Sequence, residues 1–280
     1  MILKNYSRIG FGTSKLHHLY SSSERIRLLS KAHEVGVRYF DTAPLYGHGL
    51  AEREIGKFLK LLNCRSEITI ATKFGLMPNK IVERFPKLLL PFIASRMLIG
   101  KIGPRYSKFF RPQKDFSVKK LIQQVEVSLS RINSDYIDLM YLHEPELMDL
   151  NQLEGLKTAS ESLLRQGLVR QFGVSSDWLT AKWLHENTPE IASVLQIEAP
   201  SIESVSSLQW INKNAAVTYG HFRSIRMKPK DEYWLHRVAE RAVHWNPLGT
   251  ILFSTKNTDH LRSFVSAIDV ADKNMKSKNG

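Results

Sequence analysis

Short apolar stretches rich in β-branched and aromatic residues alternate with longer amphipathic segments along most of this chain. The short stretches have the length of buried strands, and the longer ones repeat their apolar residues with the period of a helix. Strands are predicted over residues 8–13, 38–41, 68–73, 136–143, 169–174, 194–197, 215–219 and 250–253. Helices are predicted over residues 23–34, 51–62, 117–132, 153–166, 178–186, 201–212, 231–243 and 258–268.

This regular order of strand and helix is typical of βα units and of a parallel sheet. Helix start signals support it at Ser21 and Asn257, and glycines at 36 and 167 follow predicted helix ends. Eight such units in 280 residues favour an α/β fold of the closed (β/α)8 TIM barrel type over an open doubly wound sheet. We therefore expect residues 1–280 to form a single barrel domain.

A long insertion, about residues 76–116, follows the third predicted strand and far exceeds the usual length of a βα loop. Because βα loops lie at the rim where barrel enzymes build their sites, we interpret the insertion as a lid. Between Lys80 and Lys114 it carries nine basic residues and one acid, Glu83. A grip on an anionic substrate and contact with an anionic membrane surface are the alternatives. Prolines at 86, 91 and 104 make the membrane interpretation the less favoured one.

Composition narrows the classes of protein further. The apolar fraction of 42% suffices for a large core, and the formal net charge of +13 favours anionic ligands in general. Zinc-finger spacings and RNA-recognition signatures are absent, so no nucleic-acid partner is expected. No apolar run is long enough to span a bilayer and the first residues do not resemble a secretory signal, so a cytoplasmic location is expected. Cys64 is the only cysteine, and no metal site is predicted.

Four polar side chains are expected to meet at one end of the barrel. Asp41, Lys73 and His143 close the second, third and fourth predicted strands, and Tyr46 lies in the loop after the second. Singly, each has a structural explanation, such as a cap, a solvated charge or a core histidine. Together they suit hydride transfer to a carbonyl, which needs a proton donor for the developing oxyanion. A lysine favours ionisation of a tyrosine, whose ordinary pKa is about 10, while an aspartate orients the lysine and a histidine binds the substrate oxygen.

The segments FDTAPLYGHGLAEREIG, ATKFG, DYIDLMYLHEPE and LVRQFGVSS, in this order, resemble the signature blocks of the aldo-keto reductase family. Within it, GFGTSKL and DTAPLYGHGLAE are most similar to the sugar (aldose) 1-dehydrogenase branch. The resemblance implies that Asp41, Tyr46, Lys73 and His143 form the catalytic tetrad. It also implies an NAD(P)-dependent oxidoreductase acting on a small carbonyl or sugar substrate, with Tyr46 as acid or base according to direction.

The resemblance further implies a cofactor site at the same rim. NADP is the favoured cofactor because Lys256 supplies a cation for an extra phosphate, and NAD is the alternative. Ser175, Ser176 and Gln196 would hold the nicotinamide carboxamide, and Tyr219 would stack on the ring. The full set of residues assigned to the cofactor is Gly12, Thr13, Ser175, Ser176, Gln196, Tyr219, Ser254, Thr255, Lys256 and His260.

Several residues depart from the family pattern. Ser176 stands where asparagine is usual, and Gly220, His221 and Phe222 replace a Ser-Pro-Leu sequence. Ser263 and Phe264 replace polar residues expected to contact adenine, and both ends of the chain are short relative to the family. These departures keep a second hypothesis open, in which the barrel binds the cofactor but acts as a weakly active or inactive regulatory protein.

Overall fold

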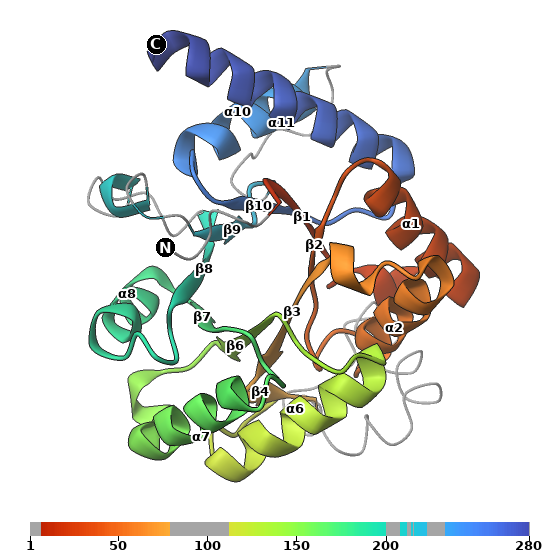
Figure 1. The fold of residues 1–280 in the computed structure, drawn as a ribbon. Coiled ribbons are helices and arrows are strands. Elements are labelled where there is room, and N and C mark those ends of the chain that lie inside the picture. Colours follow the sequence, from red (N-terminus) through yellow and green to blue (C-terminus); the bar gives the residue numbers. More distant parts are fainter. Residues whose placement is uncertain are drawn as a thin grey trace, which may run out of the picture.

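The computed structural model describes residues 7–78, 112–199, 208–211, 214, 216–222 and 233–279. Within them eight parallel strands close into a barrel surrounded by helices (Figure 1), which confirms the predicted (β/α)8 TIM barrel. The strands in order around the barrel are β1 (Ile9–Gly12), β10 (Thr250–Phe253), β9 (Val217–Tyr219), β8 (Val194–Glu198), β7 (Phe172–Ser176), β6 (Leu139–His143), β3 (Thr69–Phe74) and β2 (Tyr39–Asp41).

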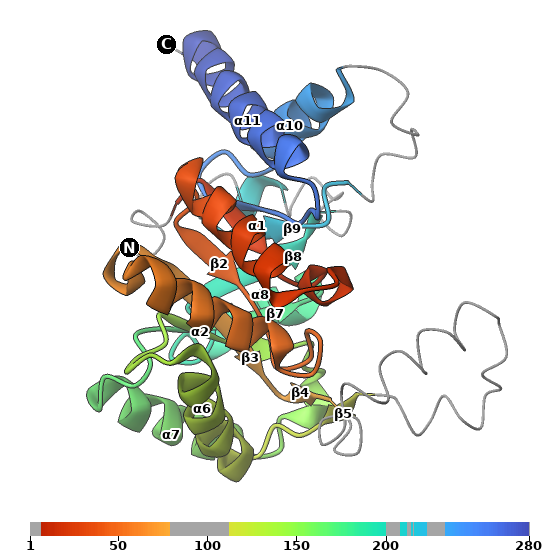
Figure 2. The same cartoon turned by 90° about the vertical axis from the view of Figure 1, so that its right-hand side faces the viewer.

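The helices of this described part pack on the outside of the barrel (Figures 1 and 2). They are α1 (Ser22–Glu34), α2 (Leu50–Leu62), α6 (Val118–Ile132), α7 (Leu153–Arg165), α8 (Trp178–Asn187), α10 (Trp234–Trp245) and α11 (Thr258–Asn279). Three short 3-10 helices, η1 (Leu16–His18), η2 (Arg65–Glu67) and η3 (Leu147–Asp149), lie in the connections. Of the helix predicted over 201–212, residues 208–211 are described and are helical. None of the described helices has the length and apolar character needed to cross a membrane.

Side chains at the helix starts satisfy amide groups that have no partner within the helix. Ser21 and Glu24 form a reciprocal capping box at α1, as the sequence pattern predicts. Ser117 accepts a hydrogen bond from the amide of Lys120 at α6, and Asp177 accepts two, from Leu179 and Thr180, at α8. These caps fix where each helix begins relative to the strand before it.

Two predicted strands are displaced in the structure. The strand predicted from 136 begins as β6 at Leu139. At this end of the ladder the amide of Ile70 donates its hydrogen bond to the Asp138 carboxylate, 2.9 Å away. The strand predicted over 169–174 is β7, Phe172–Ser176, since the hydrogen-bonded register continues through Ser175 and Ser176. Serine has neither the β-branched nor the aromatic side chain that is enriched in strands, so the sequence pattern ends this strand early.

A short antiparallel ladder joins the two ends of the insertion. β4 (Leu76–Met77) follows β3 directly and pairs with β5 (Gln113–Lys114), which precedes α6. This ladder was not predicted from the sequence. Residues 79–111, which carry most of the predicted lid, lie outside the described residues.

Large side chains fill the inside of the barrel. The hydroxyls of Tyr39 and Tyr141 are 3.1 Å apart, and both rings are fully buried. Gly10 and Gly173 make room for them, because a Cβ at either position would lie within 3.0 Å of one of these rings. The interior is therefore a packed core, which leaves the carboxyl ends of the strands as the place for a binding site.

Candidate active site

A cavity of about 680 Å³ lies at the carboxyl ends of the barrel strands. Residues that end or follow β1, β2, β6, β7, β8, β9 and β10 border it. Among them are three members of the predicted tetrad, Asp41, Tyr46 and His143, while the fourth, Lys73, is buried beneath and contacts two of them. The structure thus brings together four side chains that the sequence spreads over 102 positions.

The Lys73 ammonium is the centre of this group. Its Nζ donates to Asp41 Oδ1 at 2.6 Å and to the Thr42 carbonyl oxygen at 3.1 Å, and it lies 3.3 Å from the Tyr46 hydroxyl oxygen. Burial lowers the pKa of Lys73, while the neighbouring Asp41 carboxylate opposes that shift by favouring the charged form. An ammonium at this distance stabilises a phenolate at Tyr46 more than a phenol.

His143 closes the other side of Tyr46. The two ring centroids are 6.3 Å apart and the rings are perpendicular. Burial, and then the charge of Lys73, hold the pKa of His143 well below 6.5, so the imidazole is neutral at neutral pH. Its Nδ1 is buried and has no hydrogen-bond partner among the described residues. A neutral imidazole at the cavity wall can bind an oxygen by hydrogen bond but is a poor proton source.

Polar side chains continue from Asp41 across the mouth of the barrel. Gln196 Nε2 donates to Asp41 Oδ1 at 2.7 Å, and Ser175 Oγ donates to Gln196 Oε1 at 2.6 Å. Two other residues predicted to bind the cofactor do not border the cavity. Ser176 hydrogen-bonds to the Pro145 carbonyl and to Asp177, and Thr13 donates to the Asp41 carbonyl oxygen at 2.9 Å. Thr13 therefore positions the backbone of Asp41.

The other residues predicted to bind a cofactor also line the cavity. Ser254 Oγ there is buried without a hydrogen-bond partner in the described structure, as expected for a group that awaits a ligand. A neighbouring hollow shares Lys256 with the cavity and adds Arg27, together with Lys31 and Glu34, which form an ion pair. The cavity-lining members of the predicted set are Gly12, Ser175, Gln196, Tyr219, Ser254, Thr255, Lys256 and His260.

Aromatic rings cluster around Phe264, one of the residues that depart from the family pattern. Phe264 is fully buried and stacks on Phe253 with centroids 4.4 Å apart, and Phe222 packs against both. Phe222 and Trp234 border the cavity, and the Trp234 ring meets His260 edge-on at 6.1 Å. Two of the residues that depart from the family pattern, Phe222 and Phe264, thus belong to an aromatic cluster beside the cavity.

A buried acidic residue, which was not predicted from the sequence, fixes the strand that carries Lys73. Glu52 of α2 is fully buried and accepts hydrogen bonds from Thr72 of β3 at 2.8 Å and from Ser128 of α6 at 2.7 Å. Arg131 of α6 pairs with its other oxygen at 3.1 Å. The sequence signal for Glu52 was its place among the apolar residues of an amphipathic helix face. A glutamate that is buried there must find hydrogen-bond or ion-pair partners.

Three further charged residues at the cavity were missed. Lys15 follows β1, Glu144 follows β6, and Glu198 ends β8, and all three border the cavity. The signal for Glu144 was its position directly after His143. Glu198 follows Gln196 by two residues, so strand alternation places both side chains on one face.

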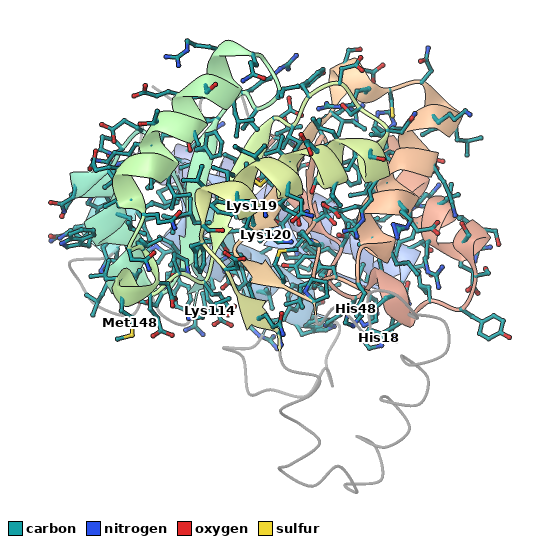
Figure 3. The ribbon with its side chains drawn as sticks, turned by 90° about the horizontal axis from the view of Figure 1, so that it is seen from below. His18, His48, Lys114, Lys119, Lys120 and Met148 are labelled. Atoms are coloured by element: carbon teal, nitrogen blue, oxygen red, sulfur yellow. The ribbon has the colours of Figure 1, made fainter. Side chains whose placement is uncertain are left out.

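A basic surface lies near the ends of the insertion. Figure 3 shows Lys114, Lys119 and Lys120 on the same face of the molecule as His18 and His48. Lys114 is paired with Glu146 at 2.6 Å and Asp149 at 3.0 Å, so its charge is compensated. The lid, the grip on an anionic substrate and the membrane contact concern residues that are largely outside the described ranges, and they stay predictions.

This arrangement suits proton transfer at the floor of a cavity. A phenol next to an ammonium can release or accept a proton, and a neutral imidazole beside it can hold an oxygen. In the described part of the chain, no three His, Cys, Asp or Glu side chains lie close enough to hold a metal ion. A model of the aldo/keto reductase family matches residues 8–204, which include all four side chains of this centre. The chain belongs to the aldo/keto reductase family.

Curated members of this family match the chain over part of their length. D-threo-aldose 1-dehydrogenase from Pseudomonas sp is 31% identical over 172 residues, which are 60% of this chain and 49% of the relative. L-galactose dehydrogenase from Arabidopsis thaliana is 28% identical over 174 residues, 60% of this chain and 44% of that protein. The chain spans about half the length of these aldo/keto reductase relatives or less.

Solved structures of aldo-keto reductases share the fold over nearly the whole chain. An enzyme from Bacillus halodurans in its holo form has a TM-score of 0.69 at 20% identity, covering 99% of this chain and 95% of its own. One from Klebsiella pneumoniae in complex with NADPH has a TM-score of 0.65 at 18% identity, covering 96% of this chain and 90% of its own. At this level of identity the likeness concerns the barrel fold.

Proposed function

We propose that this chain is a nicotinamide-dependent oxidoreductase that interconverts a carbonyl and an alcohol, with Tyr46 as the proton donor or acceptor. The observation that carries the proposal is the position of Lys73 Nζ, 2.6 Å from Asp41 and 3.3 Å from the Tyr46 hydroxyl beneath the cavity. Two curated relatives are named as sugar dehydrogenases, which makes an aldose or a similar small carbonyl compound the favoured substrate.

The cavity fits a nicotinamide cofactor. Gln196 and Ser175 offer an amide and a hydroxyl at the tetrad end, while Ser254 Oγ is buried without a partner in the described structure at the other end. Arg27 and Lys256 border the adjoining hollow, where Lys31 is paired with Glu34. A phosphate there would meet the two other cations, so NADP is the favoured form. When bound, the nicotinamide ring supplies or accepts the hydride.

In the reducing direction, the Tyr46 hydroxyl gives its proton to the carbonyl oxygen as the carbon receives the hydride. Lys73 then stabilises the phenolate, and Asp41 keeps the ammonium oriented toward it. His143, neutral because burial lowers its pKa, hydrogen-bonds the substrate oxygen and fixes its distance from Tyr46. In the oxidising direction the same groups act in reverse, with Tyr46 accepting the alcohol proton.

Substituting Tyr46→Phe tests this assignment. We expect kcat to fall by about 10²- to 10⁴-fold, because the proton donor is removed while the ring remains. Turnover is measured from the absorbance of the reduced nicotinamide with a panel of aldehydes and aldoses, and cofactor binding from quenching of tryptophan fluorescence. Tyr20→Phe is the matched control, since Tyr20 is 97% exposed and should turn over as the unmodified protein does.

Two outcomes would contradict the proposal. Equal rates for the unmodified chain and Tyr46→Phe would show that the phenol takes no part in the reaction. Cofactor binding without turnover of any substrate in the panel would instead support the second hypothesis, a regulatory barrel without catalysis.

A further inference from the structure

The cavity is divided by charge. Lys15 and Lys256 border it beside β1 and β10, whereas Glu144 and Glu198 border it at the ends of β6 and β8. In the closed barrel β1 and β10 are neighbours, and β6 to β8 lie across from them (Figure 1). An anionic cofactor is drawn to the cationic side, so the carboxylates face the space that remains for the substrate.

The backbone directs Glu144 into this space. It follows His143 directly and has a φ of 52°, a left-handed conformation that is uncommon for a residue other than glycine. Its amide donates to the Ser175 carbonyl oxygen at 2.7 Å, which ties the turn to β7. The side chain is exposed at the cavity and forms no ion pair or hydrogen bond with another described side chain. Its oxygens are therefore available to a ligand.

Glu198 approaches the same space from the other side. It is paired in register with Tyr219, and Gly220 leaves room for it, because a Cβ at Gly220 would lie 2.9 Å from Glu198 Cγ. Burial raises the pKa of Tyr219, and the charges of Glu198 and then Glu144 raise it further, which fits two carboxylates near this ring.

A group of the tetrad points to a ligand at the same place. His143 borders the cavity next to Glu144, is 5% exposed, and has a buried Nδ1 without a partner in the described structure. Buried polar groups without partners are rare in native proteins, and a ligand is one way in which such a group gains a partner. The reacting oxygen is expected beside His143, so substituents near the reacting carbon fall within reach of the two carboxylates.

We propose that Glu144 and Glu198 are specificity-determining residues that accept hydrogen bonds from the substrate. The site then selects carbonyl compounds, or the matching alcohols, that carry hydroxyl or ammonium groups near the reacting carbon, and it disfavours anionic ones. Hydrogen bonds to a charged acceptor are stronger than neutral ones, and like charges in one pocket repel. This inference rests on the proposed function, and it differs from the anionic substrate suggested by the basic insertion.

Four small aldehydes of similar size separate the possibilities: propanal, glyceraldehyde, 3-aminopropanal and glyoxylate. The quantity compared is the ratio of kcat/KM for each aldehyde to that for propanal, for the unmodified chain and for Glu144→Gln and Glu198→Gln. Each substitution keeps the shape and removes the charge. We expect the unmodified chain to prefer glyceraldehyde or 3-aminopropanal, and either substitution to reduce that preference about tenfold.

The aldehyde whose kcat/KM ratio falls more identifies the donor on the substrate. A larger fall for glyceraldehyde indicates a hydroxyl, and a larger fall for 3-aminopropanal indicates an ammonium. The charge reversal Glu144→Lys should raise the relative rate with glyoxylate. Glu146→Gln is the matched control, because Glu146 lies two residues away and pairs with Lys114 outside the cavity; its ratios should not change. Turnover with ratios that are the same in all variants overturns this inference alone, whereas no turnover with any aldehyde or alcohol counts against the proposed function.

Discussion

At the scale of single residues, burial sets the protonation of the histidines around the site. Burial, followed by the charge of Arg241, lowers the pKa of His221 from 6.5 to about 3, and burial lowers that of His17 to about 4. His221 replaces a proline of the usual family pattern, is 2% exposed and lies 3.0 Å from Thr218 Oγ1 of β9. Each such histidine is neutral in the folded protein and becomes protonated on unfolding below pH 6.5.

Stability should therefore fall with acidification. A folded pKa below the unfolded value makes a contribution that is fully present above pH 6.5 and is lost as the pH falls toward about 3 for His221. We expect His221→Gln to reduce the dependence of the unfolding free energy on pH by about 1.4 kcal/mol per pH unit within this window. Urea denaturation at pH 7, 6 and 5 measures the slope of the unfolding free energy against pH for the unmodified chain and for the variant. Identical slopes would mean that His221 is protonated in the folded protein as well.

The positions of polar groups were predicted from the sequence where these groups lie at strand ends, and their roles stay predictions. Asp41, Lys73 and His143 were located because the last residues of neighbouring barrel strands share one rim. Thr13 and Ser176 were expected at the cavity but hydrogen-bond into the structure beside it. Their rotamers depend on neighbours such as Pro145 and Asp177, which no spacing rule reveals.

At the scale of elements, α2, β3 and α6 are joined through one buried carboxylate. Glu52 receives hydrogen bonds from Thr72 and Ser128 and an ion pair from Arg131. Since Thr72 precedes Lys73, the network holds the strand that carries the ammonium. Gly56 lets α2 and α6 approach, because a Cβ there would lie 2.7 Å from two carbonyl oxygens of α6.

Removing this carboxylate should be costly. We expect Glu52→Ala to lower the unfolding free energy by about 3 kcal/mol, because it removes an acceptor shared by a buried guanidinium and two hydroxyls. Glu126→Ala on the exposed face of α6 is the control and should change stability by less than about 0.5 kcal/mol. Both values come from urea denaturation at neutral pH. Equal effects of the two substitutions would show that the network adds nothing to stability.

The boundaries of elements were harder to predict than their order. Helix caps such as Ser21 are local signals, so the start of α1 agrees with its prediction within one residue. The β4–β5 ladder was missed because its two-residue strands pair across a long insertion. The end of α11 was placed at 268 instead of Asn279, since its last turns lose the apolar periodicity on which the prediction rested.

At the scale of the whole molecule, Arg8 joins the first and last parts of the barrel. Its guanidinium donates to both carboxylate oxygens of Asp272 in α11 at 2.8–3.1 Å, and to the carbonyl oxygens of Asn246 and Gly249 ahead of β10. The backbones of β1 and β10 pair next to it. Arg8 therefore secures the seam where the barrel closes, through the part of α11 that the sequence pattern did not predict.

Loss of Asp272 should weaken this seam. We expect Asp272→Ala to lower the unfolding free energy by about 1–2 kcal/mol, the range for a hydrogen bond to a charged group that remains partly solvated. Asp269→Ala, one turn earlier on the exposed face of α11, serves as the control. Thermal unfolding followed by circular dichroism measures both. If the unfolding temperature of Asp272→Ala falls no further than that of the control, the ion pair with Arg8 does not stabilise the closed barrel.

The turn after β6 carries a residue that borders the cavity but takes no part in the hydrogen bonds of Lys73. Successive residues of a pleated strand normally point to opposite sides, yet His143 and Glu144 both border the cavity because the chain bends at Glu144. The bend lies beyond the last strand residue and outside the contacts that hold Lys73. A substitution at 144 should therefore alter which molecules are accepted while the hydrogen bonds of Lys73 to Asp41 and Thr42 are kept.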